Sequence, residues 1–305
     1  MRLILKISSI VFISILISSC ANTVQNYDER LVKKYERKGF TSSTFESEET
    51  SLFYWDNENL GKPTIVFIHG FGGDGKISWY RQIKDLHDDY RIIVPDILWF
   101  GKSHSSKEPT LSAQITAMNS LFKHLKVSNL NVVGISYGGF ITLGLAHKFP
   151  ELISKIVIVN SPGAIISDEE VDKFCDKIGV RDIKEAFVPK TGSDVKRLLG
   201  FSFYKKPPIP NFLMDQILAQ YFSQNPKEQK MLLDDLPSNR DSLSGGVRIP
   251  VEIIWGMEDE VFHVYDAYTL KDELDAELTV IKNAGHALPG EKPKKFNKVL
   301  TRIVE

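Results

Sequence analysis

The sequence predicts an α/β fold with a mainly parallel sheet. Short continuous runs of apolar residues recur along the chain, and segments with helical spacing of apolar residues separate them. A buried parallel strand has this appearance because both of its faces are covered. Between about residues 161 and 247 the alternation stops and the pattern is mostly helical. We therefore expect a helical cap inserted into the sheet domain.

Eight segments are predicted to form the sheet. The first two flank a polar break and have the pattern of a strand hairpin, and the other six are short apolar runs. In chain order the eight ranges are 43–47, 51–56, 64–68, 91–94, 131–133, 155–160, 251–254 and 278–281. Helices are expected at 79–86, 111–125, 137–148, 264–270 and 292–303. The sheet core thus comprises residues 43–160 and 248–305, and the cap comprises residues 161–247.

Composition excludes several classes of protein. The 305 residues include 38 Lys and Arg and 39 Asp and Glu, which gives a formal net charge of −1. With 42% hydrophobic and 25% charged residues, the chain has the balance of a globular protein, not of a disordered or polytopic membrane protein. Near-neutral charge argues against a nucleic-acid partner. Two cysteines are too few for a disulfide framework or a structural zinc site.

The first 19 residues have the pattern of a secretory signal peptide. Arg2 and Lys6 precede an apolar stretch that is shorter than the usual length of a transmembrane helix. The stretch ends in small residues before Cys20, which resembles the lipobox of bacterial lipoproteins. That resemblance implies cleavage before Cys20, acylation of its thiol with chains such as palmitate, and a lipid-anchored protein of the bacterial cell envelope. Ala21 is compatible with the outer membrane, and an uncleaved membrane anchor is the alternative. Residues 20–42 are polar and are expected to form a tether with some helix.

The run Gly-Ile-Ser-Tyr-Gly at 134–138 lies directly after a predicted strand and directly before a predicted helix. A turn this tight forces Ser136 into a strained backbone conformation, and the flanking glycines relieve the crowding. The turn also aims the N–H groups of the helix N-terminus at developing negative charge. We expect Ser136 to be a nucleophile; the alternative is a Gly-rich helix start with a surface serine.

A serine hydroxyl needs a base that accepts its proton. His286 lies in a loop of small residues just beyond the last predicted strand, at the sheet edge where Ser136 is expected. We therefore predict that His286 is the base. The other six histidines are expected to lie on helix faces, in polar loops or in the structural framework: His69, His87, His104, His124, His147 and His263.

An acid must orient the histidine and stabilise the imidazolium ion. Glu258, Asp259 and Glu260 all follow the preceding predicted strand, and spacing alone does not separate them. The chain order serine, acid, histidine and the preference for aspartate favour Asp259.

The glycine-rich segment 69–75 follows the predicted strand 64–68 and is expected to form an oxyanion hole. Its backbone can turn the Phe71 N–H toward a carbonyl oxygen, and the Tyr137 N–H is the expected second donor. The same glycines also satisfy a dinucleotide-binding pattern, with Asp96 at the expected distance further on. That alternative leaves the serine, acid and histidine without a role. We expect neither a cofactor nor a metal ion.

These elements in this order resemble the α/β-hydrolase superfamily, and within it the capped serine esterases of the monoacylglycerol-lipase kind. The resemblance implies ester hydrolysis in which Ser136 attacks, His286 transfers the proton, Asp259 orients His286, and water releases the acyl group. The loop at 96–103 departs from the family pattern, because Leu98 and Trp99 stand where a Pro-Gly pair is usual.

The apolar residues of the cap favour an acyl glycerol or a medium-chain acyl ester as substrate. Carbon–carbon bond hydrolases, proline aminopeptidases and a non-enzymatic envelope lipoprotein remain alternatives. The sequence does not predict the oligomeric state.

Overall fold

The computed structural model describes residues 22–305. Their strands form one nine-stranded sheet with the spatial order β1-β2-β4-β3-β6-β7-β8-β9, and β5 pairs with β2 outside this path. The strands are β1 (Thr41–Glu46), β2 (Thr50–Asp56), β3 (Thr64–Ile68), β4 (Arg91–Pro95), β5 (His104–Ser105), β6 (Leu130–Ile135), β7 (Ile153–Val159), β8 (Val251–Gly256) and β9 (Glu277–Ile281). The sequence predicted eight strands. The additional strand, β5, has only two residues, which is too short to produce an apolar run.

The sheet is antiparallel at one side and parallel through the rest. β2 pairs antiparallel with β1, β4 and β5, whereas β4, β3, β6, β7, β8 and β9 run parallel to one another. Parallel neighbours end at the same edge, so the loops after β3, β6 and β8 meet there. The predicted α/β fold class is confirmed.

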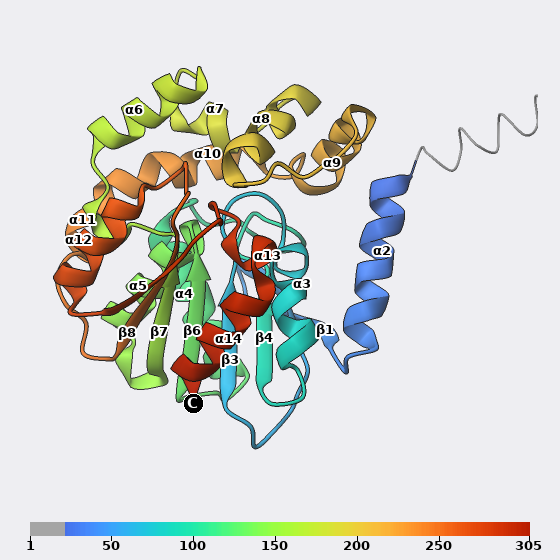
Figure 1. The fold of residues 1–305 in the computed structure, drawn as a ribbon. Coiled ribbons are helices and arrows are strands. Elements are labelled where there is room, and N and C mark those ends of the chain that lie inside the picture. The colour runs from blue at the N-terminus through green and yellow to red at the C-terminus, as the bar shows by residue number, and fades with distance from the viewer. Residues whose placement is uncertain (1–21) are drawn as a thin grey trace, which may run out of the picture.

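Helices cover both faces of the sheet (Figure 1). On one face α3 (Gly75–Leu86) and α14 (Pro293–Val304) bury Trp79 and Phe296. On the other face α4 (Leu111–His124), α5 (Tyr137–Lys148) and α12 (Val264–Leu274) pack in a second core. The short α13 (Leu288–Glu291) precedes α14. The described residues also form four 3₁₀ helices, at Pro150–Leu152, Gly163–Ile165, Asn211–Leu213 and Leu236–Asn239.

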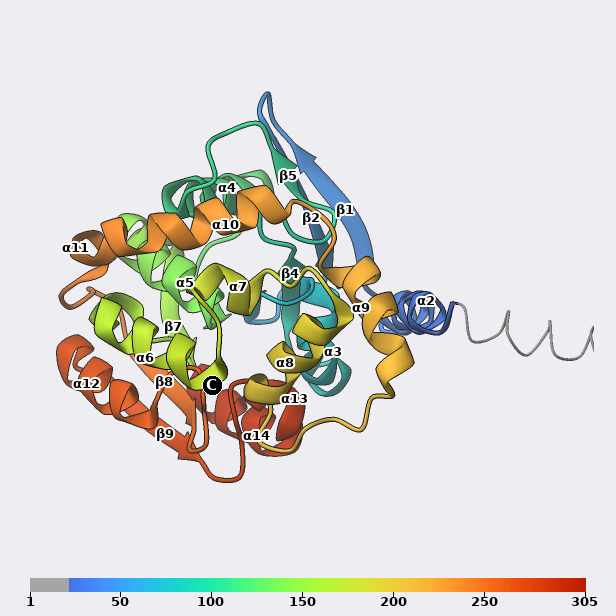
Figure 2. The same ribbon diagram turned by 90° about the horizontal axis from the view of Figure 1, so that it is seen from above.

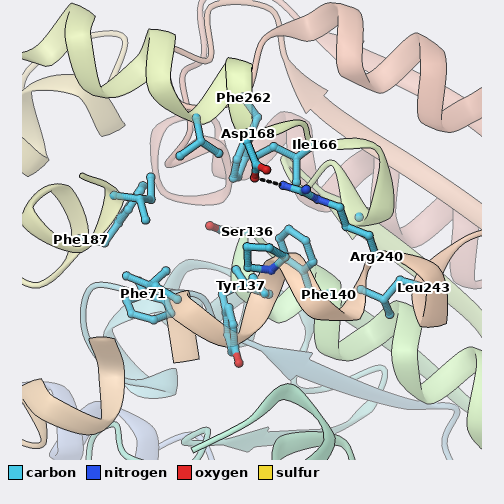
Figure 3. Close-up of a pocket in the computed structure, with 16 residues that line it drawn as sticks. Phe71, Ser136, Tyr137, Phe140, Ile166, Asp168, Phe187, Arg240, Leu243 and Phe262 are labelled. Atoms are coloured by element: carbon cyan, nitrogen blue, oxygen red, sulfur yellow. Dashed lines mark hydrogen bonds and ion pairs between the residues drawn. The ribbon is translucent and has the colours of Figure 1, made fainter. Parts of the chain in front are cut away.

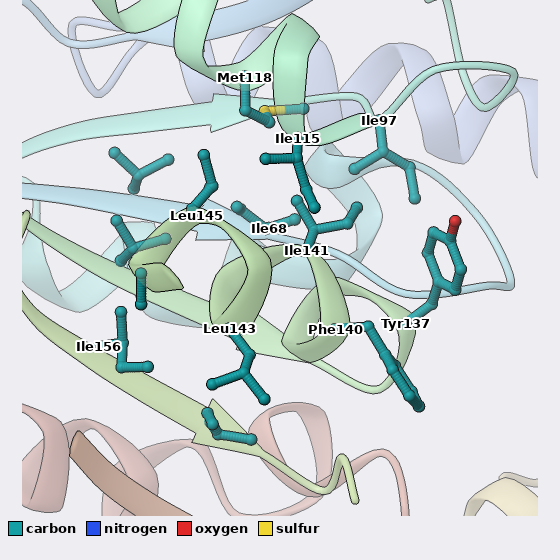
Figure 4. Packing of buried hydrophobic residues seen from close by; sticks show 14 of the residues in the cluster. Ile68, Ile97, Ile115, Met118, Tyr137, Phe140, Ile141, Leu143, Leu145 and Ile156 are labelled. Carbon is teal, nitrogen blue, oxygen red and sulfur yellow. The ribbon is translucent and has the colours of Figure 1, made fainter. Parts of the chain in front are cut away.

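α5 is surrounded by other elements and holds the segment that follows β6 in place. Ile141, Leu143 and Leu145 are fully buried, and Figure 4 shows Ile115 and Met118 of α4 on the side of α5 that carries Ile141 and Leu145, with Leu143 on the opposite side. A Cβ at Gly144 would lie 2.3 Å from Ile115 Cδ1, so the two helices approach as closely as a glycine permits. The N-terminus of α5 is therefore set on a rigid support.

The segment between β7 and β8 forms a layer of helices over one end of the sheet (Figures 1 and 2). It contains α6 (Asp168–Ile178), α7 (Ile183–Phe187), α8 (Gly192–Ser202), α9 (Met214–Tyr221), α10 (Pro226–Asp235) and α11 (Arg240–Leu243). These helices have a hydrophobic cluster of their own that includes Phe174, Phe187 and Phe201. They lie in the segment for which the sequence predicts a cap.

Over residues 20–42 the sequence predicts a polar tether with some helix, and the structure shows a helix there that is packed against the rest of the protein. Residues Thr23–Glu36 form the helix α2, which packs against α3 and α9. Val24, Leu31 and Tyr35 are buried, and their spacing of seven and four residues places them on one side of the helix. Because the other faces of α2 carry charged residues, the segment is polar overall and its composition does not reveal this apolar side.

The predicted signal peptide at 1–19 and the lipidation site Cys20 lie outside the described residues. In the part of the chain that is described, no helix combines the length and the hydropathy needed to cross a bilayer.

Candidate active site

Ser136 occupies a sharp turn between β6 and α5. Its backbone angles are φ 53° and ψ −123°, a conformation that residues other than glycine rarely adopt. The turn is held from both sides, because the Ser136 N–H donates to the Val159 carbonyl (3.0 Å) and the Gly139 N–H donates to the Ser136 carbonyl (2.8 Å). The surrounding fold therefore imposes a conformation that the serine itself disfavours.

The two glycines of the motif are required by close approach of backbone. A Cβ at Gly134 would lie 2.2 Å from both the Gly138 carbonyl oxygen and Thr142 Oγ1. A Cβ at Gly138 would lie 2.4 Å from the Ile68 carbonyl oxygen. The motif thus allows β3, β6 and α5 to converge beneath Ser136, as the sequence analysis anticipated.

His286 and Asp259 form a buried pair. His286 Nδ1 lies 2.8 Å from Asp259 Oδ2, and because a carboxylate only accepts hydrogen bonds, Nδ1 is the donor. The other carboxylate oxygen, Oδ1, accepts from the backbone N–H groups of Val261 (2.8 Å) and Phe262 (3.1 Å). Asp259 therefore fixes the tautomer that leaves His286 Nε2 free to accept a proton.

The structure separates the three carboxylates that spacing left open. Glu258 accepts a hydrogen bond from the Ala284 N–H (3.0 Å) and so joins the loop after β8 to the loop after β9. Glu260 forms an exposed ion pair with Lys177 (3.3 Å). Only Asp259 of the three pairs with His286 in the described chain.

Asn160 holds both of these loops and was missed in the sequence analysis. Its side chain is fully buried, and Nδ2 donates to the carbonyls of Gly285 (3.0 Å) and His286 (2.9 Å). Its Oδ1 accepts from the Gly256 N–H (2.8 Å) at the end of β8. The one sequence feature that could have indicated this role is the position of Asn160, an amide residue directly after the apolar run at 156–159.

Ser136 and His286 line the same cavity, which we call the large cavity. No hydrogen bond joins their side chains among residues 22–305, although both are nine-tenths buried or close to it. Contacts between nucleophile and base are often long until a substrate is bound. Ser136, His286 and Asp259, which are distant in sequence, thus lie at one edge of the sheet.

The loop after β3 is held in place by His69. The His69 imidazole donates from Nδ1 to the Gly70 carbonyl (2.7 Å) and accepts at Nε2 from the Ile97 N–H (3.0 Å). Burial lowers the pKa of His69 to about 4, so the ring is neutral near pH 7. His69 therefore has the structural role that the sequence analysis favoured.

Phe71 lies at the centre of this loop, and its ring packs edge-on against Tyr137 at 5.1 Å between centroids. Within residues 22–305 the Phe71 N–H has no hydrogen-bond partner. The N–H of Tyr137, the first residue of α5, lies among those that a helix leaves unpaired at its N-terminus.

The dinucleotide-binding alternative conflicts with the contacts below this loop. Asp74 caps α3 by accepting from the Ile77 N–H (2.8 Å), so a carboxylate already lies at the helix end where a pyrophosphate would bind. Asp96, the expected ribose ligand, is buried and accepts from the N–H groups of Gly75 (2.9 Å) and Lys102 (3.0 Å). Burial, and then the charge of Asp74, raises the pKa of Asp96 to about 7. Residues 22–305 also contain no cluster of three His, Cys, Asp or Glu side chains that could hold a metal ion.

Two cavities meet at Ser136. The large cavity has a volume of about 570 Å³ and is lined by α2, α3, α8 and α9, with His286 on its wall. The small cavity has a volume of about 100 Å³ and lies below α6, α10 and α11. Figure 3 shows Ser136 amid the residues of the small cavity, where Phe71, Phe187 and Phe262 supply apolar surface.

A charged pair lies at the edge of the small cavity. Arg240 Nη2 donates to Asp168 Oδ1 at 2.6 Å (Figure 3). Arg240 Nε is buried and has no hydrogen-bond partner among the described residues. The small cavity therefore combines apolar walls with a charged pair at its edge.

Comparison with known proteins agrees with this geometry. The family model described as "alpha/beta hydrolase fold" matches residues 63–293. The chain belongs to the alpha/beta hydrolase fold family. It is 26% identical over 243 residues to Lipase 1 of Psychrobacter immobilis, covering 77% of this chain and 74% of that protein. It is 23% identical over 259 residues to monoacylglycerol lipase ABHD6 of Bos taurus, covering 78% of this chain and 74% of that protein. The crystal structure of a membrane phospholipase A superposes with a TM-score of 0.76 at 18% identity, covering 99% of this chain and 97% of that one.

Proposed function

We propose that this chain is a serine hydrolase that cleaves carboxylic esters through an acyl-enzyme intermediate. Carboxylic ester hydrolysis in general follows from the family and from relatives named as lipases. The mechanism and the substrate are the finer part of the proposal. The observation that carries the mechanism is the His286–Asp259 pair at 2.8 Å on the wall of the cavity that also contains Ser136.

The proposed first step transfers the acyl group to the enzyme. His286 Nε2 takes the proton of Ser136 Oγ as that oxygen attacks the ester carbonyl carbon. The N–H groups of Phe71 and Tyr137 stabilise the carbonyl oxygen as it becomes negative. The C–O bond to the alcohol then breaks, and His286 returns the proton to the departing oxygen. Water, activated by His286, releases the acid in the second step.

The two cavities suggest how a substrate lies across Ser136. The volume of the large cavity falls within the usual range for ligand pockets, roughly 300–1,000 Å³, whereas the small cavity is below it. We place the acyl chain in the large cavity, where Leu198, Ile217 and Phe222 supply apolar wall. The alcohol then lies in the small cavity, where Arg240 can bind a glycerol hydroxyl. A medium-chain acyl ester or a monoacylglycerol fits this division.

A fluorophosphonate probe tests the nucleophile. The wild-type protein is expected to be labelled and Ser136→Ala is not, with Ser120→Ala on α4 as the matched control that retains labelling. Rates on p-nitrophenyl esters from acetate to palmitate then test the acyl pocket. Activity confined to acetate would contradict the chain assignment. Cleavage of proline p-nitroanilide without any ester cleavage would support the aminopeptidase alternative, and absence of labelling would support a non-enzymatic lipoprotein.

We also propose that Cys20 carries lipid and holds the protein at a membrane of the bacterial cell envelope. Thr23, only three residues after Cys20, lines the large cavity. Three residues span at most roughly 10 Å, so lipid on Cys20 would keep this end of the cavity near the membrane surface. Cys20→Ser is expected to move the protein into the soluble fraction, with Cys175→Ser as the control. Tight membrane retention of Cys20→Ser would contradict the proposal.

A further inference from the structure

α2 forms part of the wall of the large cavity. Thr23, Val24 and Tyr27, from its first two turns, line the cavity together with Ile217 and Tyr221 of α9. Figure 2 shows α2 and α9 side by side, and the two helices are in contact. The outer part of the cavity therefore depends on how α2 is held against the cap.

Asp28 joins α2 to two other elements of this wall. Its Oδ1 accepts a hydrogen bond from Lys76 Nζ of α3 and another from the Tyr221 hydroxyl of α9 (2.9 Å). The Lys76 side chain is 6% exposed and that of Asp28 is 17% exposed, so the contact is largely shielded from water. One carboxylate oxygen thus connects α2, α3 and α9.

Lys76 extends this connection to the loop that carries Phe71. Lys76 Nζ also lies 3.4 Å from Asp74 Oδ2, and Asp74 caps α3 directly after that loop. Burial alone would lower the pKa of Lys76, but the charges and hydrogen bonds of Asp74 and Asp28 outweigh it and raise the pKa above its ordinary value. Lys76 is therefore a buried cation that shares two carboxylates.

We propose that Asp28 is a positioning residue that fixes α2 as a wall of the large cavity and thereby determines how well the cavity binds acyl chains long enough to reach α2. The inference rests on the proposed placement of the acyl chain in that cavity. Asp28 does not contact the reacting atoms; it acts through the position of Val24 and Tyr27.

The consequence of losing Asp28 follows from what remains. The second half of α2 stays anchored, because Leu31 and Tyr35 are buried and the Tyr35 hydroxyl donates to the Lys76 carbonyl (3.0 Å). The first half keeps the hydrogen bond from the Val24 N–H to Gln216 Oε1 of α9 (3.2 Å) but loses its ionic contact with Lys76 and its link to Tyr221. Long chains that reach α2 then lose apolar contact, and each methylene exposed to water lowers binding about fourfold. Short chains that end before α2 are unaffected.

The test uses the full chain with Asp28→Ala, Asp28→Asn and Tyr221→Phe. Glu29→Ala is the matched control, because Glu29 is an exposed neighbour on the same helix. We expect Asp28→Ala to lower kcat/KM for p-nitrophenyl palmitate at least tenfold, mainly through KM, and to change kcat/KM for the butyrate less than twofold. Asp28→Asn should recover most of the palmitate activity, because its amide oxygen can still accept from Lys76 and Tyr221. Tyr221→Phe should have an intermediate effect. Because this variant loses only one hydroxyl group, it provides the test if Asp28→Ala fails to fold.

A binding measurement separates this inference from the proposed function. A fluorescent long-chain fatty acid is titrated into the Ser136→Ala protein with and without Asp28→Ala, and affinity should fall at least tenfold. Equal losses for butyrate and palmitate, or unchanged affinity for the fatty acid, would overturn the role of Asp28. Failure of the wild-type protein to react with a fluorophosphonate probe, with the fatty-acid result intact, would overturn the hydrolase proposal alone.

Discussion

Replacing Ser136 by glycine should abolish ester hydrolysis and at the same time give a more stable protein than replacing it by alanine. Both changes remove the hydroxyl, but only glycine adopts φ 53° and ψ −123° without strain. A strained residue of this kind costs about 1–3 kcal/mol. On the other side, glycine lowers the free energy of unfolding by about 0.5–1 kcal/mol relative to alanine, because it makes the unfolded chain more flexible. The difference leaves Ser136→Gly more stable than Ser136→Ala by about 1 kcal/mol.

Urea unfolding of the two variants, followed by circular dichroism, measures this difference. The control is the same pair of substitutions at Ser120, which lies within the helix α4. At that position alanine should be the more stable by about 1 kcal/mol, so the sign of the difference reverses between the two sites. If alanine is the more stable residue at position 136 as well, the turn is not strained in solution and the structural account of Ser136 is wrong.

Three further predictions concern the supports of the site. Asp259→Asn should keep the fold but lower kcat about 10³–10⁴-fold, because the amide no longer favours the tautomer with a proton on His286 Nδ1. Steady-state kinetics measures the loss of kcat, and thermal unfolding checks that the fold is kept. Asn160→Ala should lower both kcat and thermal stability, because three buried backbone groups lose their partner. Asp96 and His69 should oppose each other in the pH dependence of stability. The raised pKa of Asp96 gives stability below pH 4 that is lost as pH rises to about 7, whereas the lowered pKa of His69 gives stability above pH 6.5 that is lost as pH falls to about 4. Without the opposing effect of Asp96, the free energy of unfolding of Asp96→Asn should rise by about 3 kcal/mol between pH 4 and 6.5. Urea unfolding at several pH values measures this rise, and the same pH dependence as in the wild-type protein would contradict the prediction.

The parallel part of the sheet could be predicted from sequence because a strand buried on both faces must be apolar throughout. The same rule fails for β5, whose two residues pair with β2 only because the chain passes close to it. It also fails for α2. There the decisive signal is three apolar positions in a charged segment, and only contact with α3 and α9 gives that stripe a surface to cover.

Placement at strand ends predicted Ser136 and His286, because the carboxyl ends of parallel strands meet at one edge. Local order could not separate Asp259 from its two glutamate neighbours, since all three side chains leave the same loop. Their roles differ through distant partners, namely His286, Ala284 and Lys177. Asn160 was missed for the same reason, because its three partners lie about 100 residues or more further along the chain.

The loop after β3, residues 69–75, explains why polar residues are buried around the site if it forms the proposed oxyanion hole. An oxyanion hole works only if its N–H groups are already aimed when charge develops, and a loop rich in glycine does not hold such a shape by itself. Here His69 fixes the loop at its start, and Asp96 fixes it at its end through Gly75. Lys76 then ties Asp74 to α2 and, through Asp28, to the cap. The glycines supply the conformation and the buried polar side chains supply the rigidity. Because His69, Asp96 and the Asp74 cap hold the loop without Asp28, a change at Asp28 leaves the Phe71 N–H in place.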